Sequence, residues 1–152
     1  MANIHSPSAI PMSYQIKEIE FVGGKVQLLD QDIFLIQYEV KRNVVLSDVI
    51  ALRDLREELI GNREYYPIVD LSRGLIRFSD EAKAWTSVNK ESAQYRILDI
   101  FLVKGFIMKM KVKLYHAFYK PNNPSIIVTS LEKALEFIEN DRRQKLSSGK
   151  KV

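Results

Sequence analysis

The sequence predicts an α/β fold: a mixed, mostly parallel sheet with an N-terminal antiparallel meander and about four helices. The first third contains segments that alternate apolar and polar residues and are joined by short turns, as in antiparallel strands. From Ser47 onward, segments of helical periodicity alternate with short apolar runs. That alternation is typical of a parallel sheet with helical crossovers.

The meander is expected to contain three strands, Tyr14–Val22, Lys25–Leu29 and Ile33–Val40. Gly23-Gly24 joins the first two strands and is a strong hairpin signal. Asp30-Gln31-Asp32 favours a turn between the second and third strands.

The first helix is expected to begin with Ser47 as its N-cap and to end at Gly61-Asn62. Its apolar side is formed by Val49, Leu52, Leu55, Leu59 and Ile60. The next strand, Tyr66–Leu71, is almost continuously apolar, which indicates burial on both faces of the sheet.

A second helix is predicted to start at the cap residue Ser79, with Asp80 and Glu81 in its first turn. A strand at Ile97–Val103, a helix at Gly105–Tyr119 and a strand at Ser125–Val128 follow. Thr129 and Glu132 form a capping-box pattern that opens the final helix. The predicted order is therefore βββ-αβ-αβ-αβ-α.

The composition favours one domain in a reducing compartment. The chain has 152 residues, 46% hydrophobic residues, a net charge of +4 and no cysteine. Disulfides and thiolate metal sites are thereby excluded. We expect a disordered segment at 1–13, a single domain at 14–142 and a flexible basic tail at 143–152. With no signal peptide and no integral membrane segment expected, a cytoplasmic location is predicted.

The strand end Asp70-Leu71-Ser72, followed by a helix start at Ser79-Asp80, resembles STAS domains, and in particular their SpoIIAA-like branch. STAS is the fold of the anti-sigma factor antagonists, and the branch is also similar to CRAL-TRIO-type lipid-transfer domains. The resemblance implies a STAS/SpoIIAA-like fold used as a protein-interaction module or as a carrier of apolar ligands.

In this family the helix begins with an Asp-Ser-Ser-Gly-Leu-like run whose serine is phosphorylated. Alignment on Phe78 places Ser79 at the family's aspartate and Asp80 at its phosphoserine. A carboxylate there would act as a permanent phosphomimic, whereas a one-residue slip would restore Ser79 as the acceptor. Ala82-Lys83 replaces the family's Gly-Leu.

We therefore predict a partner-binding or switch site formed by Asp70, Ser72, Ser79 and Asp80. A simpler interpretation is that Ser79 and Asp80 only cap the helix, and that Asp70 accepts hydrogen bonds from the Ser72–Gly74 loop. A carboxylate pair of Asp70 with Asp99 on the next strand is a weaker alternative.

The helix at Gly105–Tyr119 has two apolar stripes. We expect the wider stripe to face the core; it contains Phe106, Ile107, Met110, Leu114, Ala117 and Phe118. The second stripe contains Met108, Val112, Tyr115 and Tyr119, with Lys109, Lys113, His116 and Lys120 between the stripes and Lys111 on the other seam. The second stripe needs a further neighbour: loops or the final helix, a second subunit, an apolar ligand, or an anionic membrane.

The leading functional hypothesis is a non-enzymatic, homodimeric interaction module that presents Asp70 to Asp80 to an unidentified protein partner. Its dimer would use Met108, Val112, Tyr115 and Tyr119. The alternative is a carrier or sensor of a lipid-like ligand, with a cavity bordered by Tyr65, Tyr66, Phe106, Met110 and Phe118.

The sequence contains no catalytic, cofactor or metal motif. His5 and His116 are too far apart to indicate a metal site, and His116 is expected on the solvated surface. The aromatic residues do not follow an RNA-binding pattern, so no nucleic-acid partner is expected.

Overall fold

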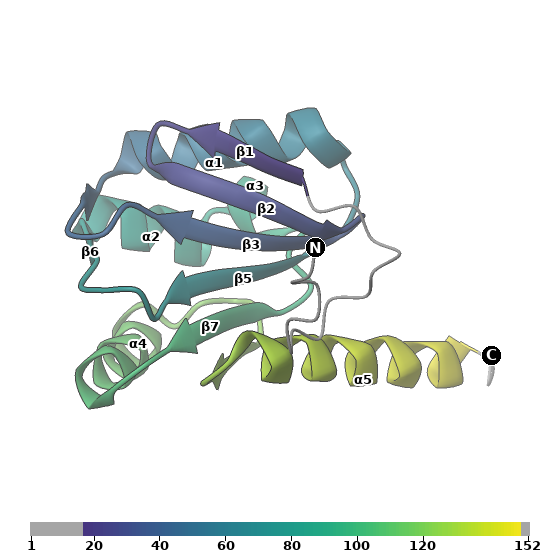
Figure 1. Ribbon diagram of the computed structural model, residues 1–152. Coiled ribbons are helices and arrows are strands. Elements are labelled where there is room, and N and C mark those ends of the chain that lie inside the picture. Colours follow the sequence, from purple (N-terminus) through teal and green to yellow (C-terminus); the bar gives the residue numbers. More distant parts are fainter. Residues whose placement is uncertain (1–16, 150–152) are drawn as a thin grey trace, which may run out of the picture.

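The computed structural model describes residues 17–149. Its main sheet has six strands in the order β1-β2-β3-β5-β7-β8 (Figure 1). The β1–β2 and β2–β3 pairs are antiparallel, and the three remaining pairs are parallel. The predicted mixed, mostly parallel sheet with an antiparallel meander is thus confirmed. The strands are β1 (Lys17–Phe21), β2 (Gly24–Asp30), β3 (Ile33–Tyr38), β5 (Tyr66–Leu71), β7 (Asp99–Val103) and β8 (Ser125–Val128).

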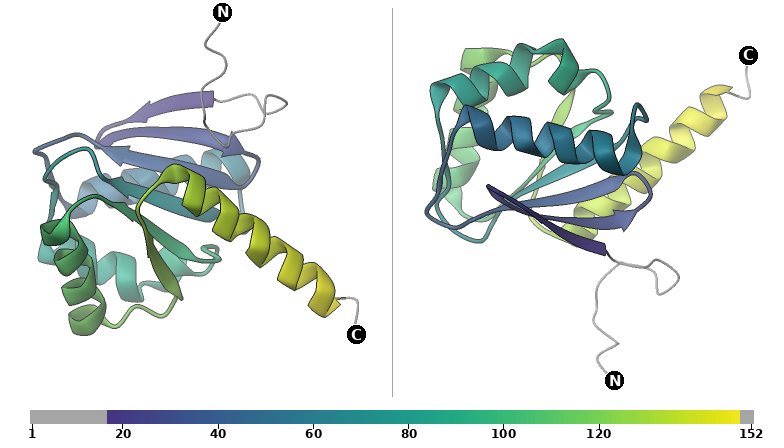
Figure 2. Two further views of the ribbon diagram at one scale, coloured as in Figure 1. Left: turned by 60° about the horizontal axis from the view of Figure 1, so that its bottom comes forward. Right: turned by 90° about the horizontal axis from the view of Figure 1, so that it is seen from above.

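Four long helices and one short helix cover this sheet. A small second sheet pairs β4 (Asn43–Val44) with β6 (Arg77–Phe78) in parallel. The helices α1 to α4 lie on one face of the main sheet, and α5 is the one helix of residues 17–149 on the other face (Figure 2). We call these the α1–α4 face and the α5 face. The helices are α1 (Leu46–Ile60), α2 (Asp80–Val88), α3 (Lys90–Ala93), α4 (Phe106–Tyr119) and α5 (Leu131–Gly149).

The α5 face is tightly packed. Ala134 and Ile138 of α5 are essentially inaccessible, as are Ile68 and Ile100 on the strands beneath them. The Tyr66 hydroxyl donates a hydrogen bond of 2.7 Å to Asp141, which fixes the helix on β5. α5 continues to Gly149, so residues 143–149 of the expected flexible tail are helical.

The observed N-caps of the helices match only some of the predicted ones. The Ser79 hydroxyl accepts the Ala82 N–H at 3.1 Å, so the predicted cap of α2 is confirmed. The predicted cap Ser47 is wrong, because α1 starts after Val45 and the buried Asp48 carboxylate accepts the Val45 N–H at 3.0 Å. The Arg42 guanidinium bonded to Asp48 lowers the pKa of that carboxyl. At α5, Ser130 rather than Thr129 provides the cap.

The expected domain limits fall partly outside the described residues. The proposed disordered segment 1–13, the first three residues of the expected Tyr14–Val22 strand, and residues 150–152 of the expected tail all lie there. The predicted strands Tyr66–Leu71 and Ser125–Val128 have the observed bounds.

Candidate functional site

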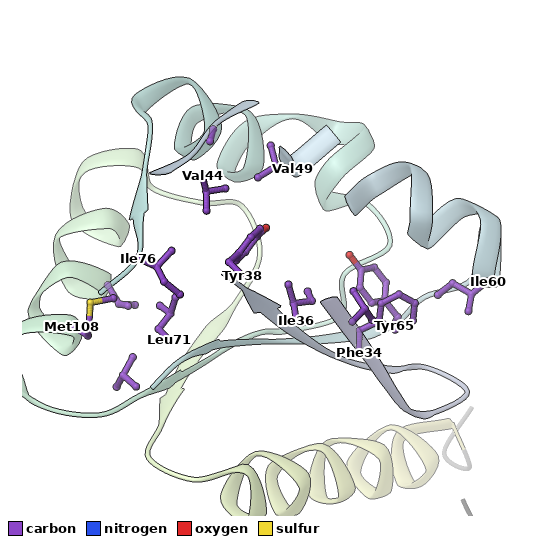
Figure 3. Close-up of a cluster of buried hydrophobic side chains, with 14 residues drawn as sticks. Phe34, Ile36, Tyr38, Val44, Val49, Ile60, Tyr65, Leu71, Ile76 and Met108 are labelled. Atoms are coloured by element: carbon purple, nitrogen blue, oxygen red, sulfur yellow. The ribbon is translucent and has the colours of Figure 1, made fainter. Parts of the chain in front are cut away.

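A cavity of about 730 Å³ lies between the sheet and the helices α1, α2 and α4. Side chains of the core on this face are shown in Figure 3. Successive strand residues point to opposite faces of a sheet, so alternate positions of three strands form the cavity floor. These are Ile36 and Tyr38 of β3, Pro67, Val69 and Leu71 of β5, and Asp99 and Phe101 of β7.

The cavity roof follows the helical period. On α4 the lining residues Met108, Val112, Tyr115 and Tyr119 recur every three or four positions, as expected for one helix face. Val49, Leu52, Arg53 and Arg56 do the same on α1. The cavity volume falls within the range of small-molecule sites, and its walls are mostly apolar.

Two arginines lie at the end of the cavity next to α1 and β7. Arg96 forms an ion pair of 2.7 Å with Asp99 and donates to the Thr86 carbonyl at 2.9 Å. Arg56 donates to the Gly61 carbonyl at 2.6 Å, and its guanidinium lies 4.8 Å from the centre of the Tyr95 ring. Both side chains are buried, so each cation is held by fixed partners rather than by water.

Three tyrosines in the wall remain protonated at physiological pH. Burial raises the pKa of Tyr38 and of Tyr65, and it raises the pKa of Tyr115 to about 12. A neutral phenol both donates and accepts hydrogen bonds. The cavity therefore offers polar groups without carrying negative charge at these positions.

The opening of the cavity lies between the start of α2 and the outer side of α4, where several lining residues are also exposed to solvent. Here the Tyr119 hydroxyl donates to the Asp80 carboxylate at 3.2 Å, and the Lys83 ammonium lies 3.9 Å from Asp80. This cluster connects the two helices across the opening. The exposed lining residues are Arg77, Asp80, Lys111, Leu114, Ala117 and Phe118.

The predicted switch residues form two separate pairs. Asp70 is buried and accepts the Ser72 N–H and the Gln37 amide, each at 2.9 Å. The expected loop-bonding role of Asp70 is thus confirmed. Because its neighbours Val69 and Leu71 line the cavity, Asp70 points to the α5 face.

The second pair, Ser79 and Asp80, is at the cavity opening. Between the pairs, the chain buries Ile76 and forms β6, and a Cβ atom at Gly74 would lie 2.6 Å from a Val40 methyl group, so a larger residue there would require Val40 to move. Within residues 17–149, no hydrogen bond or ion pair connects Asp70 or Ser72 to Ser79 or Asp80.

Asp70 and Asp99 do not meet either. In the parallel β5–β7 register Asp70 lies beside Leu102, and Asp99 is at the other end of β7. Asp99 also faces the cavity, on the opposite side of the sheet from Asp70.

The two stripes of α4 are exchanged relative to the sequence prediction. Met108 and Val112 are buried, and Tyr115 and Tyr119 are half-buried above the cavity. The wider stripe, expected in the core, is exposed instead. Periodicity alone could not choose between two apolar stripes. The four residues named for a dimer interface therefore face inward in this structure.

The cavity proposed for an apolar ligand is only partly bordered by the expected residues. Tyr65 and Phe118 line it. Phe106 and Met110 lie on the exposed side of α4, and Tyr66 points to the α5 face. Sequence reasoning missed Arg56, although its position four residues after Leu52 places it on the apolar side of α1. It also missed the Arg96–Asp99 ion pair, for which the sequence carries no specific signal.

Among residues 17–149 no group of three or more His, Asp and Glu side chains is placed to hold a metal ion. His116, expected on the solvated surface, is half-buried: it shares a hydrogen bond of 2.7 Å with Ser125 and packs on Phe101. Within the same part of the chain, no helix has the length and apolar character needed to cross a membrane.

Residues 27–142 match the family model described as "Domain of unknown function (DUF7793)". The chain belongs to the DUF7793 family. Every residue that lines the cavity of this DUF7793 domain falls inside the matched range. No curated protein matches the sequence.

Among solved structures, the DUF7793 domain is similar to an uncharacterized protein of the DUF3478 family, with a SpoIIAA-like fold, from Shewanella loihica PV-4. The two are 12% identical, and the TM-score is 0.48. The alignment covers 81% of this chain and 91% of that chain.

Proposed function

We propose that this domain binds an apolar small molecule with an anionic end in the cavity beneath α4, as a carrier or sensor without a chemical step of its own. The observation that supports this function is the cavity of about 730 Å³, whose walls are mostly apolar and whose opening carries the cations Arg77, Lys83 and Lys111 against the one carboxylate of Asp80. The apolar body of the ligand would replace water against Val69, Phe101 and Val112.

The charges at the opening favour an anionic end. Arg77, Lys83 and Lys111 contribute three positive charges there, against the single carboxylate of Asp80. Asp80 is already engaged by Tyr119 and Lys83, whereas Arg77 and Lys111 are exposed. A carboxylate or phosphate of the ligand would form charge-assisted hydrogen bonds with these cations.

Ligand binding can be tested with a fluorescent fatty-acid analogue. We expect saturable binding to the wild-type protein and at least tenfold weaker binding to Val69→Phe, which fills the cavity from its floor. Val88→Phe is the matched control, because Val88 is exposed at the end of α2 and outside the cavity. Equal affinity of the two variants and the wild type would show that the cavity is not the binding site. Native mass spectrometry of protein purified from its own host would identify a co-purified ligand.

A second candidate function is a STAS-like protein-interaction module, which the exposure of Asp80 favours. The Asp80 side chain is 92% exposed at the N-terminus of α2, on the edge of the cavity opening. A partner bound at this helix start would also contact residues that line the cavity opening. The surroundings of those residues change when a ligand fills the cavity. Ser79 and Asp80 would then be its recognition residues.

Partner recognition can be tested by cross-linking in host cells. We expect Asp80→Lys to remove a specific cross-linked protein, whereas Asp54→Lys on α1 should retain it; Asp54 is also exposed. Mass spectrometry of Ser72 and Ser79 from the same cells would test phosphorylation. If the same proteins cross-link to both variants and to the wild type, recognition through Asp80 is contradicted.

A further inference from the structure

The outer side of α4 is an exposed apolar surface. Phe106, Ile107 and Leu114 are each more than 60% exposed, and Phe118 is 81% exposed. With Met110 and Ala117, these side chains occupy one continuous side of the helix, opposite the buried Met108 and Val112. Large apolar side chains gathered on one surface indicate an interaction site.

Along α4 itself, every charged residue beside this surface is a lysine. On a helical projection Lys109 and Lys113 flank the apolar stripe on one side, and Lys111 flanks it on the other. Lys104 and Lys120 stand at the two ends of the helix. Residues 104–120 contain no aspartate or glutamate. The occupant of the surface must therefore be apolar at its centre and negative around it.

A second copy of this chain fits this surface poorly. In a two-fold symmetric contact, each copy would place the same helix against itself. Lysines of both copies would then approach one another with no carboxylate of α4 to neutralise them. Like charges brought together in this way are unfavourable.

We propose that α4 docks the domain on an anionic lipid surface. The apolar stripe would enter the boundary between headgroups and acyl chains, and the lysines would lie among the anionic headgroups. No residue of α4 needs to leave the core, because Met108 and Val112 remain on the cavity side. The helix would lie in the plane of the membrane surface and would not cross it.

This inference does not depend on the cavity ligand, although the two surfaces meet. Leu114 and Phe118 belong both to the exposed stripe and to the cavity lining. A domain docked through α4 would therefore have its cavity opening at the lipid surface. An apolar molecule could then pass between the lipid and the cavity with little exposure to water.

The docking proposal is tested by flotation with vesicles of phosphatidylcholine alone and of phosphatidylcholine with phosphatidylserine. We expect binding only to the vesicles that contain phosphatidylserine, and weaker binding as salt is raised. Ile107→Gln combined with Phe106→Gln should weaken binding at least about tenfold, because two inserted apolar side chains are lost. Leu146→Gln on α5 is the matched control, because Leu146 and Ile107 are both 67% exposed. It should bind like the wild type.

Two double variants, one on α4 and one on α5, test whether vesicle binding requires the positive charge of α4. Lys109→Gln with Lys113→Gln should weaken binding about 30-fold, from roughly 1 kcal/mol for each lysine near the surface. Lys133→Gln with Arg143→Gln changes the net charge equally but lies on α5, and should have little effect.

Three outcomes would overturn the proposal: no flotation with anionic vesicles, equal binding to neutral vesicles, or equal effects of the α4 and α5 variants. The remaining alternative is that the surface binds a second copy of the chain, and light scattering on wild type and Leu114→Glu tests it. A wild-type dimer that dissociates in the variant would assign the surface to a second copy. The fatty-acid titration is a separate measurement. Vesicle binding can therefore fail while cavity binding stands, and the reverse.

Discussion

The two faces of the main sheet are covered in different ways. On the α5 face a single helix lies directly on the strands, and Ile68, Ile100, Ala134 and Ile138 are sealed against each other. On the α1–α4 face three long helices share the cover, and large side chains such as Phe101 remain only partly buried. The α5 face is thus filled by its own helix, whereas the α1–α4 face has a buried cluster of its own and also encloses a cavity.

The ion pairs should show the largest difference between the faces. Asp99→Asn leaves the Arg96 guanidinium buried without its carboxylate, and we expect a loss of about 3–5 kcal/mol in the free energy of unfolding. Asp30→Asn removes a more exposed partner of Arg142 on the α5 side, and Asp32 remains; the loss should be about 1 kcal/mol or less. Urea denaturation measures both values. Similar losses would mean that the Arg96–Asp99 pair is not the more deeply desolvated one.

Matched isoleucines on adjacent strands test packing directly. Ile68→Ala on the α5 face should cost about 2–5 kcal/mol of stability, because it creates a void in a filled core. Ile36→Ala should cost at least about 1 kcal/mol less, because its side chain already borders the cavity and loses fewer contacts. The difference is measured by guanidinium unfolding of the two variants at one temperature. Equal costs would contradict an empty cavity on the α1–α4 face.

Replacing a buried alanine with leucine tests the same packing difference by adding atoms instead of removing them. Ala134 and Ala82 are both inaccessible, one on the side of α5 that packs on the sheet and one in the cavity lining. Ala134→Leu should destabilise the protein by about 1–3 kcal/mol through overpacking. Ala82→Leu should be nearly neutral, since the added methyl groups can enter the cavity. In thermal unfolding, the melting temperature of Ala82→Leu should therefore lie close to that of the wild type and above that of Ala134→Leu. The reverse order of the two variants would refute this prediction.

The alkaline limit of stability should come mainly from the cavity face, where Tyr38, Tyr65 and Tyr115 are held protonated. The folded-state pKa of Tyr115 is about 12, above its ordinary value of 10.0. Its contribution is therefore complete below pH 10 and is lost as pH rises towards 12. By about pH 11 the expected loss is roughly 1.4 kcal/mol from Tyr115. Urea titrations at several pH values should show a shallower decline for Tyr115→Phe, and an unchanged decline would contradict its role.

Prediction from sequence succeeded where the signal was local. The strand Tyr66–Leu71 was recognisable from its apolar run, and the cap at Ser79 from its own side chain and the acidic residues that follow. The hydrogen bond from Ser72 to Asp70 spans only two residues, and it too was predicted.

Prediction failed where the answer depends on residues far away in the chain. Both stripes of α4 are apolar, and only the position of the sheet decides which one is buried. The cavity itself results from the spacing of three helices over three strands, so no single segment encodes it. The partner of Arg96 could not be chosen among many carboxylates before the chain was folded.

The position of α5 in the chain determines when its face of the sheet can be covered during synthesis. The strand residues that α5 covers, from Leu29 to Val128, are all made before its own core residues Ala134 and Ile138. During translation, the strand residues of this face therefore have no cover from α5 until α5 itself emerges. The ion pairs of Arg142 with Asp30 and Asp32 join residues more than 100 positions apart, and they too can form only after α5 has been made. A nascent chain stalled before α5 should therefore be a good substrate for chaperones that bind exposed apolar surface.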